Sequence, residues 1–199
     1  MPESGVGALV LAAGQGSRYR EHLNEDKLRA PCRVDSDSTS VMEATLMALQ
    51  GATEQSLVVV REDNRGLREW LAQNEQRLSF TTLAVTSRGL GHSLAQAVAH
   101  QTRARGWLVV LGDMPYVRGE TLRRIAAAIR EDALVVPVHQ GRRGHPRGIG
   151  SAYRDALLTL DGDQGAQALF AGNLLIELDV DDPGILQDID RPQDRLPGC

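Results

Sequence analysis

The stretch "VLAAGQGSRY", residues 10–19, runs from an apolar segment straight into two glycines and then an arginine. Gly14 and Gly16 allow a ligand to approach the backbone closely and tolerate a positive φ. A glycine-rich bend at the end of a buried strand is typical of a phosphate site, and Arg18 and Lys27 would add positive charge to it. The bend therefore predicts phosphate chemistry at the end of the first strand.

Two common phosphate loops do not fit this bend. A dinucleotide-binding fold has G-x-G-x-x-G here, and the position of the third glycine is taken by Tyr19. A P-loop has four residues between its glycines and then Gly-Lys-Ser/Thr, a pattern that is absent. Two interpretations stay open: a bend that wraps a triphosphate with backbone N–H groups, and a plain strand-to-helix turn.

Strand-like and helix-like segments alternate along the rest of the chain. Continuous apolar runs predict buried strands, and helical spacing of apolar residues predicts helices. The expected strands are 7–13, 56–61, 80–86, 107–112, 133–138 and 174–180. The expected helices are 38–51, 65–74, 93–102 and 120–131, with two short helices after residue 150. The polar stretch 20–40 predicts a long mobile loop, and 141–150 a basic loop.

This alternation predicts an α/β protein built on a three-layer, mostly parallel, Rossmann-like open sheet. No composition break, internal repeat or low-complexity segment divides the chain, so residues 1–199 are expected to form a single domain. Ligands bind at the carboxyl ends of the strands in such sheets. The loops after residues 12, 86, 112 and 138 should therefore share one cleft.

Composition narrows the function classes. The net charge of −4 is spread along the 199 residues, which argues against binding to nucleic acid or a membrane surface. The longest apolar runs are too short to span a membrane, and no signal core follows Met1. Cys32 and Cys199 form neither a metal spacing nor a disulfide framework. We therefore expect a cytoplasmic, reducing setting.

Asp113, in "VVLGDMPYV" (109–117), comes just past the end of an expected strand and should lie at the cleft. A carboxylate there can hold Mg²⁺, which prefers oxygen ligands and phosphate oxygens. The alternative is a turn former ahead of Pro115.

A cationic, glycine-rich stretch, "GRRGHPRGIG" (141–150), suits an anionic substrate. It also fits a solvated surface loop. A small nucleic-acid contact fits less well, because no aromatic residues interleave and the chain is acidic. His139 and His145 lack the further ligands of a zinc site.

Near the end of the chain, "QDIDRPQDRL" (187–196) places Asp188 and Asp190 two residues apart. In an extended segment they would point to opposite faces, so one of them could face the cleft. Surface acidity and capping are the favoured interpretation for Asp188.

Taken in order, these pieces resemble the MobA-like nucleotidyltransferases, and within them the molybdenum cofactor cytidylyltransferase branch. The resemblance covers nearly the whole chain. It is carried by "LVLAAGQGSR" (9–18), Lys27, "GLGHSLAQAV" (89–98), "LGDMPYV" (111–117), "VVPVHQGRRGHPRGIG" (135–150), "GDQGAQAL" (162–169) and "DIDRPQD" (188–194).

The resemblance implies a sheet of the nucleotidyltransferase type, Mg²⁺ as cofactor and transfer of a nucleoside monophosphate from an NTP to a phosphorylated acceptor. The acceptor would be the pterin-type molybdenum cofactor, with a molybdoenzyme as the eventual recipient. It implies catalytic roles for Arg18, Lys27 and Asp113, and metal binding by Asp113 and Asp190. Nucleotide binding would fall to Leu11, Ala12, Ala13, Gly14, Gly16, Arg18, Lys27, Gly91 and Ser93, and acceptor binding to His145, Pro146 and Arg147.

Ala13 bears on the choice of base. In the resembling family, guanylyl-transferring members tend to have glycine at this position and cytidylyl-transferring members alanine, so CTP is expected. Two stretches depart from the family pattern: "YREH" (19–22), part of a longer segment before Lys27, and "RAPCRVDSDST" (29–39) after it. A sugar- or polyol-phosphate nucleotidyltransferase, or a non-catalytic cofactor-binding or delivery protein, stays open as an alternative.

Overall fold

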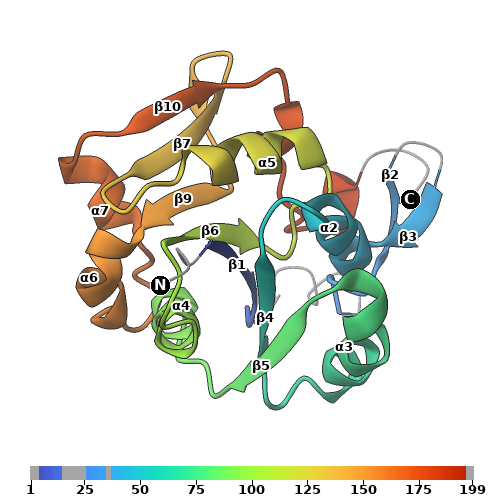
Figure 1. Cartoon of the computed structure of the whole chain (residues 1–199). Helices are drawn as coiled ribbons and strands as arrows, with labels where there is room; N and C mark the ends of the chain where they lie inside the picture. Colours follow the sequence, from blue (N-terminus) through green and yellow to red (C-terminus); the bar gives the residue numbers. More distant parts are fainter. Residues whose placement is uncertain (1–4, 15–25, 35–36, 196–199) are drawn as a thin grey trace.

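A mixed, mostly parallel sheet forms the middle of the protein in the computed structural model, which describes residues 5–14, 26–34 and 37–195 (Figure 1). Its order is β10-β7-β9-β6-β1-β4-β5, with β8 paired to β7. Apart from β9 and β8, which run antiparallel to their neighbours, the strands pair in parallel. The strands are β1 (Val6–Ala12), β4 (Gln55–Arg61), β5 (Thr81–Val85), β6 (Gly106–Leu111), β7 (Leu134–His139), β8 (Arg142–Arg143), β9 (Arg147–Gly150) and β10 (Ile176–Asp179).

Helices cover both faces of this sheet. One core cluster joins α2 (Val41–Leu49), α3 (Arg65–Leu78) and α5 (Gly119–Ala128) to one face, and a second joins α4 (Leu90–His100), α6 (Arg154–Leu158) and α7 (Gln167–Gly172) to the other. These three layers, visible in Figure 1, confirm the predicted fold class. No helix in the described part of the chain is both long and apolar enough to cross a membrane.

The central strand explains why the sequence begins with a continuous apolar run. In β1, Val10 and Ala12 belong to the core on the α2 side, whereas Leu9 and Leu11 belong to the core on the α4 side. A strand covered on both faces needs apolar residues at every position. The strand thus ends at the buried Ala12, and the buried Ala13 and the exposed Gly14 follow it.

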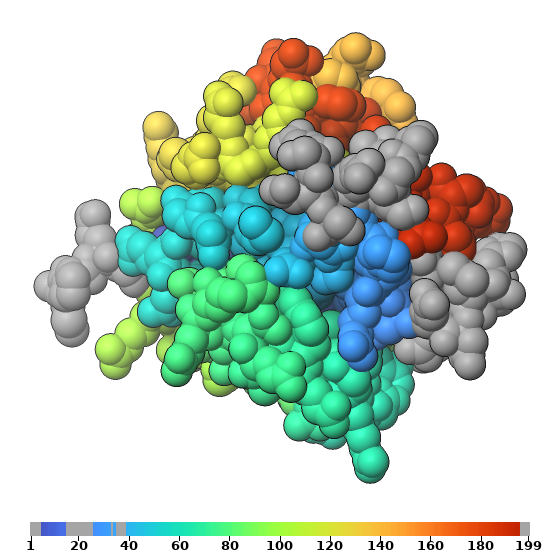
Figure 2. Space-filling view, turned by 90° about the vertical axis from the view of Figure 1, so that its right-hand side faces the viewer, coloured from blue at the N-terminus to red at the C-terminus, as the bar shows by residue number. Residues whose placement is uncertain are grey.

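The prediction of a long mobile loop at 20–40 is wrong for its second half, which contains two strands. Residues 20–25 lie outside the described part, but β2 (Pro31–Val34) and β3 (Asp37–Ser40) form an antiparallel hairpin. The hairpin is ordered despite its polar sequence, because Cys32 is fully buried in the same core as α2. Figure 2 shows α2, in cyan, between α3 and α5, with light-blue atoms of the hairpin region beside it.

The prediction of a basic loop at 141–150 is also wrong, because most of these residues form β8 and β9. Two glycines let β9 fit between β6 and β7: a Cβ at Gly148 would come within 2.6 Å of Ile129, and one at Gly150 within 2.2 Å of the Arg130 carbonyl oxygen. The glycines and arginines of this segment predict a loop when only the local sequence is considered. Close packing under α5 makes residues 147–150 a strand instead.

The remaining predicted elements are present, with shifted ends. α3 continues to Leu78 and stops where Ser79 adopts a left-handed backbone (φ 55°), and α4 begins three residues early, at Leu90. The two short helices expected after residue 150 are α6 and α7.

Candidate active site

Lys27 lies on a short turn that is fixed from both sides. The Leu28 amide donates to Asp26 Oδ1 at 3.0 Å, and Asn64, the cap of α3, donates from Nδ2 to Asp26 Oδ2 at 2.6 Å. On the other side, the Met42 amide in α2 donates to the Leu28 carbonyl at 2.9 Å. The turn therefore holds the lysine in a defined place even though the segment before it lies outside the described residues.

Asp113 lies two residues after the end of β6, beside the end of β1. The Gly112 amide donates to the Leu11 carbonyl at 3.0 Å, and the buried Thr45 hydroxyl donates to the Gly112 carbonyl at 3.2 Å. The Ile189 amide donates to the Asp113 carbonyl at 2.9 Å, which brings the segment with Asp190 to the same place.

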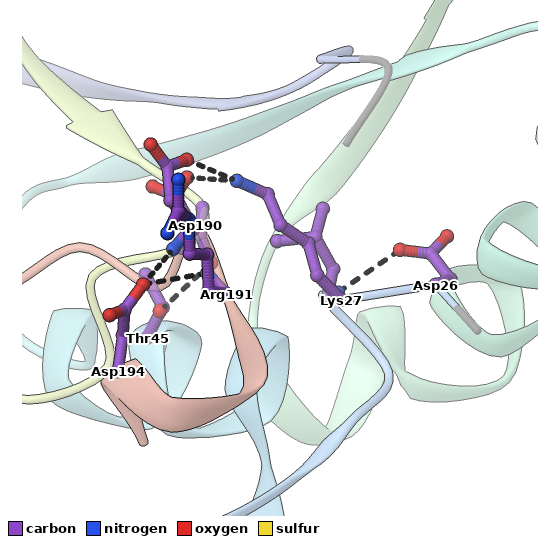
Figure 3. A network of polar contacts seen from close by, with 9 residues as sticks. Asp26, Lys27, Thr45, Asp190, Arg191 and Asp194 are labelled. Carbon is purple, nitrogen blue, oxygen red and sulfur yellow. Dashed lines mark hydrogen bonds and ion pairs between the residues drawn. The ribbon is translucent and has the colours of Figure 1, made fainter. Parts of the chain in front are cut away.

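These contacts join three residues that are far apart in the sequence. Lys27 Nζ lies 2.6 Å from Asp113 Oδ2 and 3.4 Å from Asp190 Oδ1 (Figure 3). Lys27 and Asp113 are mostly buried, with side chains 14% and 18% exposed, whereas Asp190 is 38% exposed. The structure thus places three predicted site residues in one charged cluster at the carboxyl ends of the central strands.

The carboxylates keep Lys27 protonated. Burial by itself would lower the pKa of this ammonium group, but the charges and hydrogen bonds of Asp113 and then Asp190 outweigh it and raise the pKa above its ordinary value. Lys27 therefore carries a full positive charge at neutral pH.

Asp113 has coordination capacity left over. Its Oδ1 is buried and has no hydrogen-bond partner among the described residues, a costly state for a carboxylate oxygen. No group of three or more His, Cys, Asp or Glu in the described part of the chain is arranged so that it could hold a metal ion by itself. A pair of carboxylates such as Asp113 and Asp190 fits Mg²⁺, which is commonly bound through one or two carboxylates with water and substrate phosphates completing its shell.

Asp188 is close to this cluster, and its interpretation as simple surface acidity is incomplete. The residue as a whole is exposed. Even so, partial burial of its carboxyl group, with the nearby charges of Asp113 and Asp190, raises its pKa. It adds to the negative potential around the site, where Lys27 is the opposing charge.

Next to the cluster, a cavity of about 430 Å³ opens at the carboxyl ends of β1 and β4. Leu11 and Ala13 form a buried floor. Gly14 continues the wall, and the segment after β5 closes it. The lining residues are Leu11, Ala13, Gly14, Arg61, Ser87, Arg88, Gly89, Leu90, Ser93 and Asp163.

Four predicted nucleotide-binding residues line this cavity: Leu11, Ala13, Gly14 and Ser93. Two others do not. The Ala12 side chain turns to the opposite core, as strand alternation requires. Gly91 is buried in the first turn of α4 and contacts the 162–164 segment instead of the cavity.

Lys27 belongs instead to the charged cluster, and the last two nucleotide-binding candidates, Gly16 and Arg18, lie outside the described residues. Sequence reasoning missed Arg61, Ser87 and Asp163. Arg61 ends an apolar strand and Ser87 follows one. Their positions at the carboxyl ends of strands were the available signal that they could line the cavity.

The prediction that four loops share one cleft holds only in part. The loops after β1 and β5 line the cavity, and the loop after β6 carries Asp113 beside it. The loop after β7 turns back as β8, where Arg143 Nε donates to Glu177 at 2.6 Å on the surface. An antiparallel hairpin carries that loop along β7 and away from the cavity.

His145, Pro146 and Arg147 lead into β9 from the direction of the site. Arg147 pairs with Val109 in β6, and because β9 is antiparallel, His145 lies further toward the end of β6 that carries Asp113. The His145 amide donates to the Ile185 carbonyl at 2.9 Å. The three residues predicted to bind the acceptor thus lie at or just before the start of β9, the strand next to β6, toward the end of β6 that precedes Asp113.

The Arg147 guanidinium packs on an aromatic ring and forms no ion pair with the described residues. Its guanidinium carbon lies 4.6 Å from the centre of the Phe170 ring, and its Nε is buried with no hydrogen-bond partner among the described residues. Burial, with repulsion from Arg143, lowers the pKa of Arg147. A partly desolvated guanidinium held on an aromatic face is suited to bind an anion.

His145 makes stability depend on pH. Burial, and to a smaller extent Arg147, lower the pKa of His145 to about 4, so the folded imidazole stays neutral well below the pKa of about 6.5 of an unfolded histidine. The unfolded chain binds the extra proton first, so stability should fall as the pH drops from about 6.5 toward 4, by up to roughly 3 kcal/mol. Urea unfolding at pH 7, 5.5 and 4.5 measures this loss.

The pH effect is assigned by comparing variants. His145→Gln should flatten the pH dependence over that window, while His100→Gln, at an exposed histidine, should retain it. An unchanged slope in His145→Gln would assign the proton uptake to other groups.

Comparisons with known proteins identify the family of the chain and its structural neighbours. A family model described as the MobA-like NTP transferase domain matches residues 8–179. The bifunctional protein GlmU of Stutzerimonas stutzeri (strain A1501) is 34% identical over 128 residues, 64% of this chain and 26% of that protein. GlmU of Azotobacter vinelandii is 33% identical over 148 residues, 74% of this chain and 30% of that protein. The chain thus spans less than a third of the length of these relatives.

Solved structures share the fold over almost the whole chain. Rv0371c from Mycobacterium tuberculosis H37Rv has a TM-score of 0.77 and 27% identity, with 96% of each chain covered. The same protein solved as a complex with manganese has a TM-score of 0.75 and 26% identity, again with 96% of each chain covered. A nucleotidyl transferase from Methanothermobacter (Mth528) has a TM-score of 0.76, covers 96% and 94%, and at 24% identity shows the fold alone.

Proposed function

The chain belongs to the MobA-like NTP transferase domain family, and from that premise we propose that it transfers the cytidylyl group of CTP to the terminal phosphate of the molybdenum–molybdopterin cofactor. The observation that carries the proposal is the Lys27–Asp113–Asp190 cluster beside a cavity floored by Leu11 and Ala13. A nucleotide with its base in the cavity would extend its phosphates toward that cluster.

The reaction needs positioning and charge more than covalent chemistry. An oxygen of the acceptor phosphate forms a bond to the α-phosphorus, and the bond from that phosphorus to the bridging oxygen breaks, with its electron pair leaving on pyrophosphate. No general base is required, because a phosphate monoester is already largely ionised near neutral pH. Catalysis then comes from alignment and from stabilising the charge that develops on the leaving group.

In this scheme Lys27 neutralises the leaving pyrophosphate, together with Arg18 of the glycine bend. Asp113 and Asp190 would hold Mg²⁺, which would supply Lewis-acid stabilisation of the phosphate oxygens. The manganese complex of Rv0371c supports a divalent cation in this fold. The buried, unpartnered Asp113 Oδ1 supports Asp113 as its main ligand.

Pyrophosphate release tests the function directly. Each of the four NTPs is mixed with the purified protein, Mg²⁺ and a molybdopterin-type acceptor, with sugar phosphates and polyol phosphates as alternative acceptors. Release is expected with CTP and the pterin acceptor. Release only with a sugar or polyol phosphate would move the protein to the runner-up function, and no release with any pair would favour a non-catalytic cofactor-binding or delivery protein.

We expect Ala13 to determine which base the site prefers. Its methyl group lies on the buried floor of the cavity, where it would crowd a bicyclic guanine and pack against cytosine. One methyl in a pocket changes discrimination by about 10- to 200-fold. We expect kcat/KM to favour CTP over GTP within that range, and Ala13→Gly to reduce the preference.

A neighbouring alanine provides the matched control. Ala12→Gly removes the same methyl group from the opposite face of the strand, so the CTP/GTP ratio should stay as it is. Equal use of GTP and CTP by the wild type would refute the assignment. An unchanged ratio in Ala13→Gly would place selectivity in the segment after β5.

The acceptor side depends on Arg147. We expect Arg147→Ala to raise the KM for the phosphorylated acceptor by about tenfold or more and leave the KM for CTP unchanged, because a hydrogen bond to a charged group contributes about 1.5–3 kcal/mol. Steady-state kinetics with each substrate varied in turn separates the two constants. Arg143→Ala is the control, because that arginine is exposed and already paired with Glu177. A rise in the KM for CTP would place Arg147 on the nucleotide side.

A further inference from the structure

A segment from late in the chain closes the nucleotide cavity. The Gly162 carbonyl accepts hydrogen bonds from the amides of Gly91 at 2.9 Å and His92 at 3.4 Å, in the first turn of α4. Beside it, Arg88 and Asp161 form an ion pair at 3.1 Å. The segment 161–164 is therefore attached to the start of α4, and Asp163 becomes part of the cavity wall.

Two glycines in α4 and before it make room for this segment. A Cβ at Gly91 would lie 2.2 Å from the Gln164 carbonyl oxygen, so any side chain there would push the segment away. At Gly89, which has a φ of 137°, a Cβ would lie 2.5 Å from Asp163 Oδ1. The Asp163 carboxylate thus lies against the Gly89 backbone, at the rim of the cavity.

The charge of Asp163 limits what it can face. No hydrogen bond or ion pair joins its carboxylate to the described residues, so its oxygens are available to accept hydrogen bonds from a ligand. A carboxylate would repel a triphosphate, and the cluster that suits phosphates, with Lys27, lies at the end of β6 instead. Asp163 therefore suits the neutral nucleoside, which offers hydroxyl donors on ribose and, in cytosine, an amino donor.

The position of Asp163 favours ribose over the base. The floor of the cavity is apolar and buried at Leu11 and Ala13, where a flat base can pack, whereas Asp163 is exposed at the rim. Resting on the proposed function, we propose that Asp163 accepts a hydrogen bond from a ribose hydroxyl of the bound nucleotide and makes the site selective for ribonucleotides over deoxynucleotides.

Four nucleotides test this proposal: CTP, 2′-deoxy-CTP, 3′-deoxy-CTP and UTP. Their Kd values are measured by calorimetry, and kcat/KM is measured with the acceptor that supports turnover. The wild type should prefer CTP over at least one deoxy analogue by about tenfold or more, the effect of losing a hydrogen bond to a charged group. In Asp163→Ala that ratio should fall close to one.

Two further variants separate a direct contact from a loosened segment. Asp163→Asn keeps an accepting oxygen without the charge and should show an intermediate ratio. Asp161→Ala removes the ion pair to Arg88 but no group from the cavity wall, so it should weaken CTP and deoxy-CTP alike and leave their ratio at the wild-type value. Circular dichroism confirms that each variant is folded.

The outcomes distinguish this inference from the function on which it rests. A wild type that binds CTP and both deoxy analogues equally overturns the role of Asp163 while leaving cytidylyl transfer intact. A change in the CTP/UTP ratio of Asp163→Ala, with the CTP/deoxy-CTP ratio unchanged, overturns it in favour of the cytosine amino group. No binding of any nucleotide by the wild type would instead overturn the proposed function.

Discussion

Replacing Asp113 by asparagine is expected to lower turnover by about 10²-fold or more while the protein stays folded, a loss of about 2.7 kcal/mol of transition-state stabilisation. Asp113 contributes the buried Oδ1, which has no hydrogen-bond partner among the described residues, and the Oδ2 that lies 2.6 Å from Lys27 Nζ. Asparagine has nearly the same shape but no charge, so it weakens both the cation site and the placement of the lysine. Initial rates across a Mg²⁺ titration measure the effect.

Asp190→Asn serves as the graded control for this prediction. Asp190 is farther from Lys27, at 3.4 Å, and its side chain is more exposed, so the loss should be smaller. In both variants the Mg²⁺ concentration for half-maximal rate should rise, which a purely structural role would not produce. Near-normal turnover of Asp113→Asn at limiting Mg²⁺ would remove Asp113 from the metal site.

Lys27→Ala is expected to impair catalysis by at least tenfold, and far more than Lys27→Arg. The lysine is held by the 26–28 turn and stays protonated, so it can meet negative charge as it develops on the leaving pyrophosphate. Arginine keeps the charge with a different geometry, whereas alanine removes it. Single-turnover rates with saturating CTP measure the chemical step apart from nucleotide binding.

The neighbouring Arg29 tests the alignment across the long segment before the lysine. Arg29 is exposed, while Lys27 is the residue that contacts Asp113 and Asp190. Arg29→Ala should therefore be close to wild type. A large loss in Arg29→Ala, with none in Lys27→Ala, would show that the cation of this site was misidentified.

The chain's own pattern was enough to predict the elements that are covered on both faces. β1 and β4 have apolar residues at nearly every position because each packs between two helical layers, and that burial is written into the local sequence. The same holds for β6, because the polar Asp113, two residues after the apolar run that ends at Leu111, marks the edge of the sheet. Fold class and the position of one site carboxylate thus followed from local patterns.

Elements whose order comes from distant packing could not be predicted in this way. The β2–β3 hairpin and β9 are polar or rich in glycine, and only burial of Cys32 and the tight fit of Gly148 against Ile129 make them strands. Their local sequences are typical of loops, because a contact made by a residue far along the chain leaves no periodic signal.

The site itself shows the same division. Its residue types were readable from the sequence, but the meeting of Lys27 with Asp113, 86 positions away, and with Asp190, 163 positions away, was decided by the tertiary structure. Strand order brings the ends of β1 and β6 together. The hydrogen bond from the Ile189 amide to the Asp113 carbonyl brings the segment with Asp190 to the same place. The presence of Asp163 on the cavity wall has the same origin, because only glycines at 89 and 91 let a late segment approach α4 closely enough. Local sequence encodes which residues are buried, whereas close approach between distant segments depends on how the whole sheet is assembled.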